Sequence, residues 1–383
     1  MIDSIKEKFY ELFEGEPVIV RSPGRVNLIG EHTDYNMGFV LPAAIDKAVY
    51  YAIKPRKDKQ VNLFAFDLNE EWQFEVDEVR KSEKSWANYL IGVVDQINQS
   101  GREIMGFDCV FGGNIPIGAG LSSSAAIEAG LAYALNNLFD LGFDKIELVK
   151  LAQRAENQFV GVQCGIMDQY INIFGKKGNV LRIDCRSLDY EYFPFEFDGV
   201  SVVLFNTNVS HSLASSEYNQ RRKECSAGVD IIKQKYPHIE SLRDVTLDML
   251  EENKDQLDGV IYKRCKYVIE ENERLLSACE ALNKNDLREF GQFMYGSHQG
   301  LSKEYEVSCP ELDYLVELVA DREGVYGARM MGGGFGGCTI NLIENKYVDS
   351  VSQFVKENYK KKFGIEAEVY ITSINNGTEI IEL

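Results

Sequence analysis

The chain has 383 residues and a formal net charge of −19 at pH 7, from 41 basic and 60 acidic residues. Hydrophobic residues make up 45% of the sequence and charged residues 26%, proportions that exclude disordered and fibrous classes. An acidic surface repels phosphate backbones and anionic lipids, so we predict no nucleic-acid partner and no membrane association.

The first third of the chain predicts a short helix followed by strands. Apolar residues at helical spacing predict a helix over 5–13. Short runs rich in β-branched and aromatic residues, separated by turn residues, predict the strands that follow. These strands cover 17–22, 39–45, 48–53, 61–66 and 72–76. We therefore expect a β-rich layer in this region.

Helical signals dominate the next part of the chain. They predict helices over 86–97, from 121 onward and over 145–159, with one strand over 105–113. Strands followed by packed helices, rather than a strict alternation, favour an α+β fold over a doubly wound sheet.

The second half of the chain predicts strands over 179–184 and 200–206, separated by a turn-rich segment where the chain crosses between domains. Helices dominate from 214 to about 322. A helix over 346–361 and a strand over 366–373 close the chain. We predict two domains, 1–190 and 191–383, which fits a chain of this length.

The eight cysteines are scattered, without a CxxC pair or zinc-type spacing, which is typical of reduced core thiols. The first residues, MIDSIKEKFYELF, lack the basic-then-apolar order of a signal peptide, and no run of about 18 apolar residues occurs. These features predict a cytoplasmic location.

The segment GGNIPIGAGLSSSAAIEAG, residues 112–130, places glycines and small residues directly before a periodic helix. Backbone N–H groups at such a helix N-terminus suit the phosphates of a nucleotide, and a first-turn serine can add a hydroxyl ligand for Mg²⁺. A simple turn with a serine N-cap would give the same pattern. The sequence contains no GxxxxGK[ST] P-loop and no HRD or DFG element of protein kinases.

A second glycine-rich element, GARMMGGGFGGC, covers 327–338 and has five glycines between Gly332 and Gly337. This density requires a permissive backbone. A close approach to a ligand or to the first glycine loop is one interpretation, and a β-bulge or disordered turn is the other.

The segment GRVNLIGEHTDYNMG, residues 24–38, gathers charged and polar side chains in a stretch too irregular for a helix or a strand. Glu31, His32 and Asp34 are clustered acceptors with one imidazole, which suits the hydroxyls of a sugar or polyol. A solvated turn would also explain the pattern, and the lone histidine makes a metal site a poor explanation. Arg25 is a candidate for binding an anionic substrate, because its positive charge acts locally while the net negative charge of the protein repels anions.

Two further clusters carry candidate residues. In AENQFVGVQCGIMDQY, residues 155–170, Glu156 lies on a predicted helix and Asp168 follows a glycine turn among apolar neighbours. A carboxylate in such surroundings is either capped structurally or functional. In HSLASSEYNQRRKEC, residues 211–225, Tyr218 lies at the start of a helix, where it serves packing or a ligand.

In this order, the motifs resemble those of one family, the galactokinases of the GHMP small-molecule kinase superfamily, over nearly the whole chain. GRVNLIGEHTDYNMGFVLP is similar to the galactokinase signature, PIGAGLSSSAA to the superfamily's ATP motif and GARMMGGGFGGC to its third motif. The first is the most specific, because homoserine and mevalonate kinases share the glycine motifs but not GEHTDY.

The resemblance implies roles for particular residues. Asp168 would be the catalytic base and Arg25 the residue that steadies the transferring phosphoryl group, while Ser124 and Glu156 would hold Mg²⁺. The predicted sugar-binding residues are Glu31, His32, Thr33, Asp34, Gly165 and Tyr218. The predicted ATP-binding residues are Gly118, Ala119, Gly120, Leu121, Ser122, Ser123 and Ser124.

The resemblance also implies two α+β domains with the active site in the cleft between them. The implied reaction is ATP-dependent phosphorylation of the anomeric hydroxyl of α-D-galactose, which yields galactose 1-phosphate and ADP and opens galactose catabolism. We expect a monomer with galactose and ATP as its small-molecule partners.

Three other hypotheses stay open. Before Tyr218 the chain has SSEYN where many relatives have GSEYN, so N-acetylgalactosamine is a second candidate for the sugar. A different sugar kinase of the same superfamily would share the glycine motifs. A sensor that binds sugar and ATP without catalysis would also carry these binding residues.

Overall fold

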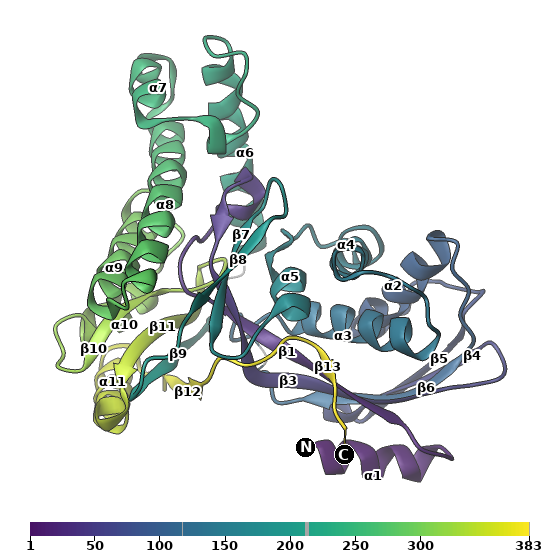
Figure 1. The fold of residues 1–383 in the computed structure, drawn as a ribbon. Coiled ribbons are helices and arrows are strands. Elements are labelled where there is room, and N and C mark those ends of the chain that lie inside the picture. The colour runs from purple at the N-terminus through teal and green to yellow at the C-terminus, as the bar shows by residue number, and fades with distance from the viewer. Residues whose placement is uncertain (117, 211–213, 383) are drawn as a thin grey trace.

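The computed structural model describes residues 1–116, 118–210 and 214–382. Its strands form three sheets with helices packed on them, which confirms the predicted α+β class (Figure 1). The sheets have the strand orders β13-β1-β3-β6-β4-β5, β10-β11-β9-β12 and β2-β7-β8.

The largest sheet contains the N-terminal strands. Its members are β1 (Val18–Asn27), β3 (Pro42–Pro55), β4 (Gln60–Ala65), β5 (Glu70–Glu75), β6 (Phe107–Gly113) and β13 (Glu379–Ile380). The helices α2 (Ser85–Gln99), α3 (Ser123–Leu138), α4 (Lys145–Arg154) and α5 (Met167–Phe174) lie over one face, and α1 (Ile2–Leu12) lies on the other (Figure 1). The apolar side chains between them form a core that removes a large hydrophobic area from water.

The second large sheet belongs to the C-terminal half. It contains β9 (Val200–Ser210), β10 (Val325–Met330), β11 (Gly336–Glu344) and β12 (Glu368–Thr372). The helices of this half are α6 (Ala214–Lys233), α7 (Leu247–Glu252), α8 (Gly259–Asn283), α9 (Leu287–Lys303), α10 (Pro310–Val319) and α11 (Val348–Phe363). The small third sheet joins β2 (Phe39–Val40), β7 (Asn179–Asp184) and β8 (Tyr190–Pro194).

The division into 1–190 and 191–383 stays a prediction. Two pairings bear on it: β8, which starts at Tyr190, pairs with β7, and β13 at the end of the chain pairs with β1. The C-terminal segment therefore returns to the N-terminal sheet, so the two halves share a sheet as well as a connection.

Several predicted boundaries were wrong. Arg25 lies on strand β1 rather than in an irregular loop, because a register shift between Pro23 and Arg25 lets the strand continue past the proline. The strands predicted over 39–45 and 48–53 are β2 and one long β3. The helix predicted over 145–159 ends as α4 at Arg154 and continues as a π-helical turn, Ala155–Val160.

Candidate active site

A cavity of about 490 Å³ lies where the N-terminal sheet, the loop after β1 and the C-terminal half meet. Its lining comes from β1, the loop before α5, α6 and the turn after β10. Segments that are distant in sequence thus surround one space. The predicted residues that line it are Arg25, Glu31, His32, Asp34, Gly165, Asp168 and Tyr218.

An arginine and a carboxylate face each other in this cavity. Arg25 Nε donates to Asp168 Oδ1 at 2.9 Å, and Arg25 Nη2 donates to Asp168 Oδ2 at 3.0 Å, a bidentate pair. The third guanidinium nitrogen donates to the Gly120 carbonyl, and the Ser122 hydroxyl donates to Asp168 Oδ2. Burial is the largest single influence on the pKa of Arg25 and lowers it, but the charge and hydrogen bonds of Asp168, together with the charges of Glu31 and Asp34, raise the pKa overall, so the guanidinium stays protonated.

The first glycine motif has an open backbone beside this pair. Gly118 and Gly120 have φ of +76° and +71°, and a Cβ at either position would meet no atom within 4 Å. Ser122, the N-cap of α3, also has a positive φ of 59° and makes no capping hydrogen bond with its side chain. The loop therefore presents backbone to open space at a helix N-terminus, which suits an anion. Ile117, inside the predicted motif, lies outside the described residues.

Ser124 and Glu156 lie together next to this helix N-terminus. Glu156 is buried on the π-helical turn, a distortion common at functional sites, and its Oε2 accepts from Gln169 Nε2 at 2.8 Å and from the Cys164 thiol at 3.3 Å. Burial raises the pKa of Glu156, and hydrogen bonds from Cys164 and Ser124 oppose that shift. The predicted metal residues are thus brought into contact.

Asp34 and Gly165 are fitted to each other. A Cβ on Gly165 would lie 1.6 Å from Asp34 Oδ2, so only glycine allows the carboxylate this position. Burial raises the pKa of Asp34 to about 6, the neighbouring Tyr35 backbone lowers it, and the nearby Asp168 raises it again. Asp34 is therefore an acceptor whose charge state depends on pH near neutrality.

The His32 ring is enclosed by aromatic side chains. Its centroid lies 5.4 Å from that of Tyr218 and 5.1 Å from that of Tyr305. His32 is 5% exposed, and burial lowers its pKa to about 4 against the opposing charge of Glu31, so the ring is neutral at pH 7. Its Nδ1 is hydrogen bonded to the Tyr35 hydroxyl, and its Nε2 has no hydrogen-bond partner of good geometry in the described part of the chain.

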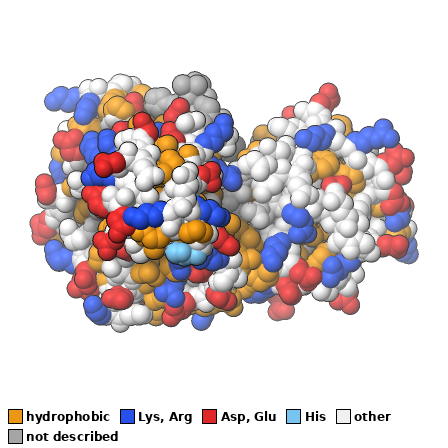
Figure 2. All heavy atoms as spheres, turned by 90° about the horizontal axis from the view of Figure 1, so that it is seen from above, with side chains coloured by type: hydrophobic (Ala, Val, Ile, Leu, Met, Phe, Trp, Pro, Cys, Tyr) orange, Lys and Arg blue, Asp and Glu red, His pale blue; other side chains and the backbone are white. Residues whose placement is uncertain are grey.

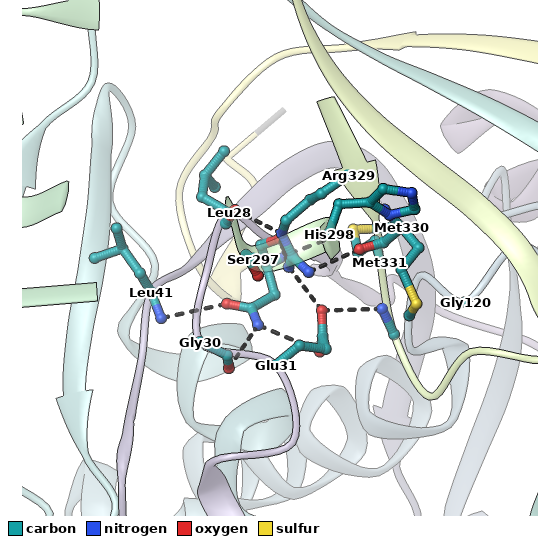
Figure 3. Close-up of polar contacts among 12 residues, drawn as sticks. Leu28, Gly30, Glu31, Leu41, Gly120, Ser297, His298, Arg329, Met330 and Met331 are labelled. Atoms are coloured by element: carbon teal, nitrogen blue, oxygen red, sulfur yellow. Dashed lines mark hydrogen bonds and ion pairs between the residues drawn. The ribbon is translucent and has the colours of Figure 1, made fainter. Parts of the chain in front are cut away.

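Glu31 is held by an arginine from the C-terminal half (Figure 3). Arg329 Nη2 donates to Glu31 Oε2 at 2.7 Å, and the backbone N–H of Gly332 donates to the same oxygen at 3.0 Å. The Arg329 side chain is fully buried and also donates to the carbonyls of Asn27, Leu28 and Met330. One Glu31 oxygen is thus occupied, and this ion pair ties the loop after β1 to strand β10.

Thr33 does not line the cavity. It is fully buried, and its hydroxyl donates to the carbonyls of Gly30 and Phe39. Its structural role is to shape the loop that presents Glu31 and Asp34. Ser215 of the SSEYN segment belongs to a stretch whose side chains lie outside the described part of the structure, so its predicted effect on sugar choice stays a prediction.

The second glycine motif contributes to the cavity. Gly332 and Gly333 line it, and a Cβ on Gly334 would lie 2.1 Å from the Val307 carbonyl oxygen. The pairing of β11 with β9 shifts register between Gly336 and Cys338. The motif therefore contains a bulge, as one interpretation predicted, while its close approach to a ligand or to the first glycine loop stays a prediction.

Several residues that build this site were not predicted from the sequence. Arg329 is a charged residue inside the apolar GARMM strand, a signal that we could have used. Tyr35 and Tyr305 carry no such signal, because an isolated tyrosine is most often a packing residue. All eight cysteines are free, and Cys164 is the one that is only partly buried.

Three family models match the chain. The galactokinase galactose-binding signature matches residues 7–55, the GHMP kinase N-terminal domain 88–176 and the GHMP kinase C-terminal domain 278–361. A galactokinase of Roseiflexus sp. (strain RS-1) is 43% identical over 380 residues, which cover 98% of this chain and 97% of that protein. The chain belongs to the galactokinase family. As a member, it is an enzyme, a sugar kinase.

Further relatives agree with this assignment. A galactokinase of Thermotoga maritima is 40% identical over 362 residues, which cover 94% of this chain and 99% of that protein. The crystal structure of Lactococcus lactis galactokinase complexed with galactose is 36% identical, covers 99% of both chains and has a TM-score of 0.94. The Methanococcus jannaschii mevalonate kinase, 20% identical with a TM-score of 0.66 and covering 95% of this chain and 100% of that one, shares the fold.

The outer surface of this galactokinase-family enzyme carries both signs of charge. On the face in Figure 2, acidic and basic side chains are interspersed. Among the described residues, no helix is both long and apolar enough to pass through a bilayer.

Proposed function

We propose that the enzyme transfers the γ-phosphoryl group of ATP to the anomeric hydroxyl of galactose, with Asp168 as the base and Arg25 beside it. The observation that carries the proposal is the bidentate Arg25–Asp168 pair, which lies between the open glycine loop and the cavity lined by Asp34 and His32. A phosphate donor and a polyol acceptor would meet at this pair.

The cavity supplies complementary groups for a sugar. Asp34 offers carboxylate acceptors, His32 offers a ring nitrogen without a protein partner of good geometry among the described residues, and the Tyr218 ring forms part of the wall. Arg329 donates to Oε2 of Glu31, so Oε1 can accept from a sugar hydroxyl. In the protein, Oε1 accepts only a long hydrogen bond, from the Asn27 amide at 3.3 Å, among the described residues. Buried polar groups that stay unpaired without the correct hydroxyl discriminate strongly between sugars.

The transfer requires alignment and charge stabilisation more than covalent catalysis. The anomeric oxygen forms a bond to the γ-phosphorus, the bond from that phosphorus to the β,γ-bridging oxygen breaks, and ADP leaves. Asp168 orients the hydroxyl and accepts its proton. Arg25 keeps its charge next to the oxygens on which negative charge develops.

The nucleotide phosphates would lie at the N-terminus of α3, where Gly118 and Gly120 have open space beside the backbone. The carbonyl of Gly120 accepts from Arg25, so the loop and the arginine are already joined. Binding of ATP would therefore place its γ-phosphate next to Arg25.

The residues present fit a magnesium ion. A buried carboxylate and a hydroxyl, Glu156 and Ser124, lie in contact beside the phosphate-binding loop, and both are oxygen donors. The described residues contain no group of three His, Cys, Asp or Glu that could hold a metal, which suits an ion that takes most of its ligands from phosphates and water. When bound, Mg²⁺ would neutralise charge on the β- and γ-phosphates.

The decisive experiment measures ADP release with galactose, N-acetylgalactosamine and glucose. We expect turnover with galactose to exceed that with either other sugar by at least about a hundredfold. If turnover were fastest with N-acetylgalactosamine, that sugar would replace galactose as the proposed substrate. Sugar-dependent thermal stabilisation without ADP release would identify a sensor.

A further inference from the structure

A series of hydrogen bonds runs from His32 away from the cavity into the C-terminal half. His32 Nδ1 lies 2.8 Å from the Tyr35 hydroxyl, which lies 2.8 Å from the Tyr305 hydroxyl. The Tyr305 hydroxyl in turn lies 3.2 Å from Cys225 Sγ. The proposed function assigns the ring of His32 to the sugar but gives these other residues no role.

Tyr305 is rigidly held. It is fully buried, its ring centroid lies 4.7 Å from that of Tyr267 on α8, and its carbonyl accepts from Arg221 Nε at 2.7 Å. Its hydroxyl therefore has a fixed position with two possible partners, Tyr35 and Cys225. A hydroxyl fixed at this point restricts the hydrogen bonds on both sides of it.

The series of hydrogen bonds has a preferred direction. In a neutral imidazole one nitrogen donates and the other accepts, and each phenol can donate one hydrogen and accept another. If the hydrogen bonds point toward His32, the Cys225 thiol donates to Tyr305, Tyr305 to Tyr35 and Tyr35 to Nδ1. The Cys225 sulfur then accepts the hydrogen bond from Asn36, and every group of the series is satisfied except the Nε2–H of His32, a residue that lines the cavity.

The opposite direction leaves a group unsatisfied. The Cys225 sulfur would accept from both Tyr305 and Asn36, and its own hydrogen would have no acceptor in the described part of the chain. Cys225 is 1% exposed, so water does not replace that acceptor.

We propose that Tyr305 is a positioning residue for the sugar site: acting through Tyr35, it keeps the proton of His32 on Nε2. The ring then presents an N–H donor to the cavity and takes a sugar oxygen as its acceptor. The effect on sugar binding rests on the proposed function, whereas the position of the His32 proton does not. Tyr305 touches no substrate in this scheme, because its effect passes through two hydrogen bonds.

The tautomer can be measured without substrate. The chain has four histidines, so protein labelled with ¹⁵N only in histidine gives few ring signals, and His32→Asn identifies those of His32. At pH 7 we expect the His32 proton on Nε2, with Nδ1 as a hydrogen-bond acceptor. In Tyr305→Phe the Nδ1 signal should move toward that of a nitrogen without a hydrogen bond, because the donor Tyr35 loses the group that polarises it.

Tyr359→Phe is the matched control. Tyr359 is also fully buried, and its hydroxyl donates to the Thr207 carbonyl at 2.9 Å, in a different core cluster. This variant should leave the His32 signals unchanged. A proton on Nδ1 in the unmodified protein, or His32 signals that Tyr305→Phe does not move, would overturn the proposal.

Calorimetry then tests the consequence for the sugar. We expect Tyr305→Phe to weaken galactose binding by roughly three- to tenfold, the effect of one weakened hydrogen bond, with kcat and the KM for ATP within about twofold of the original values. Equal losses in galactose binding, ATP binding and kcat would mark a merely structural role and overturn the proposal. An unmodified protein that binds no galactose would contradict the proposed function instead. The position of the His32 proton would still be decided by the NMR measurement, which needs no sugar.

Discussion

Both oxygens of the Asp168 carboxylate are held by one guanidinium, Arg25, at 2.9 and 3.0 Å. The pair shares its surroundings with the Ser122 hydroxyl and the Gly120 carbonyl, both from the first glycine motif. A base in this position is oriented before any substrate arrives, which reduces the entropy that the reaction must lose. Removing the charge of Asp168 should therefore affect the chemical step before it affects binding.

Asp168→Asn should fold normally and lose at least about a thousandfold in kcat, because an amide cannot accept the proton of the anomeric hydroxyl. Galactose binding should stay within about threefold, since the cavity keeps Asp34 and His32. ADP-release kinetics and calorimetry measure the two quantities. Near-normal turnover of this variant would disprove the assignment of the base.

Galactose binding should weaken as the pH falls through about 6, the pKa to which burial raises the Asp34 carboxyl. The protonated carboxyl loses acceptor capacity, whereas His32, with a pKa of about 4, does not titrate in this window. Calorimetric titrations between pH 5 and 8 check the profile. Asp34→Asn should bind galactose weakly at every pH, with ATP binding intact; a profile that keeps its slope in this variant would place the titrating group elsewhere.

The same carboxyl predicts a change in stability. In the folded protein the pKa of Asp34 is about 6, above the ordinary value of 3.8, so the folded state binds more protons than the unfolded state between these values. The contribution of Asp34 to stability is therefore fully present below about pH 4 and is lost as the pH rises to 6. Asp34→Asn should therefore raise the free energy of unfolding at pH 7 by about 1–2 kcal/mol. Denaturant unfolding at pH 7 and pH 4 measures the difference, which should shrink at pH 4.

Gly165→Ala should reduce galactose affinity by at least about tenfold, because its Cβ would lie 1.6 Å from Asp34 Oδ2 and would displace that carboxylate. Gly259→Ala is the control, since a Cβ at that position meets no atom within 4 Å. Calorimetry with galactose and thermal unfolding compare the two variants. If both bind galactose as the original protein does, the fit between Gly165 and Asp34 has no bearing on the sugar.

Glu156→Gln should raise the Mg²⁺ concentration needed for half-maximal turnover by about ten- to a hundredfold, because a neutral amide is a weaker ligand for a hard cation. Galactose binding in the absence of metal should not change. A magnesium titration of ADP release gives the first quantity and calorimetry the second. Glu317→Gln, at an exposed position of α10, should leave both unaltered, and an unaltered Mg²⁺ requirement in Glu156→Gln would remove Glu156 from the metal site.

Much of the fold was predictable, because periodicity reports on burial. Strand β7 occurs at the predicted residues, and helices α2, α3 and α11 each begin within two residues of the predicted first residue. The errors fell where tertiary contacts override local signals. The strand β1 passes through Pro23 at a bulge, and β8 forms in a segment that was predicted as a turn-rich connection, because β7 provides a partner for it.

The residues that bear chemistry were identifiable by their types and their motifs: a guanidinium, clustered carboxylates and an imidazole, and glycines before a helix are all visible in the sequence. Their partners were not, since Arg329 reaches Glu31 across 298 positions and Tyr305 reaches Tyr35 across 270. Local sequence determines which groups are available and which backbone conformations are allowed. Only the packing of distant segments decides which groups meet, how far burial shifts their pKa values and which ring nitrogen faces the cavity, because each of these depends on distances through space.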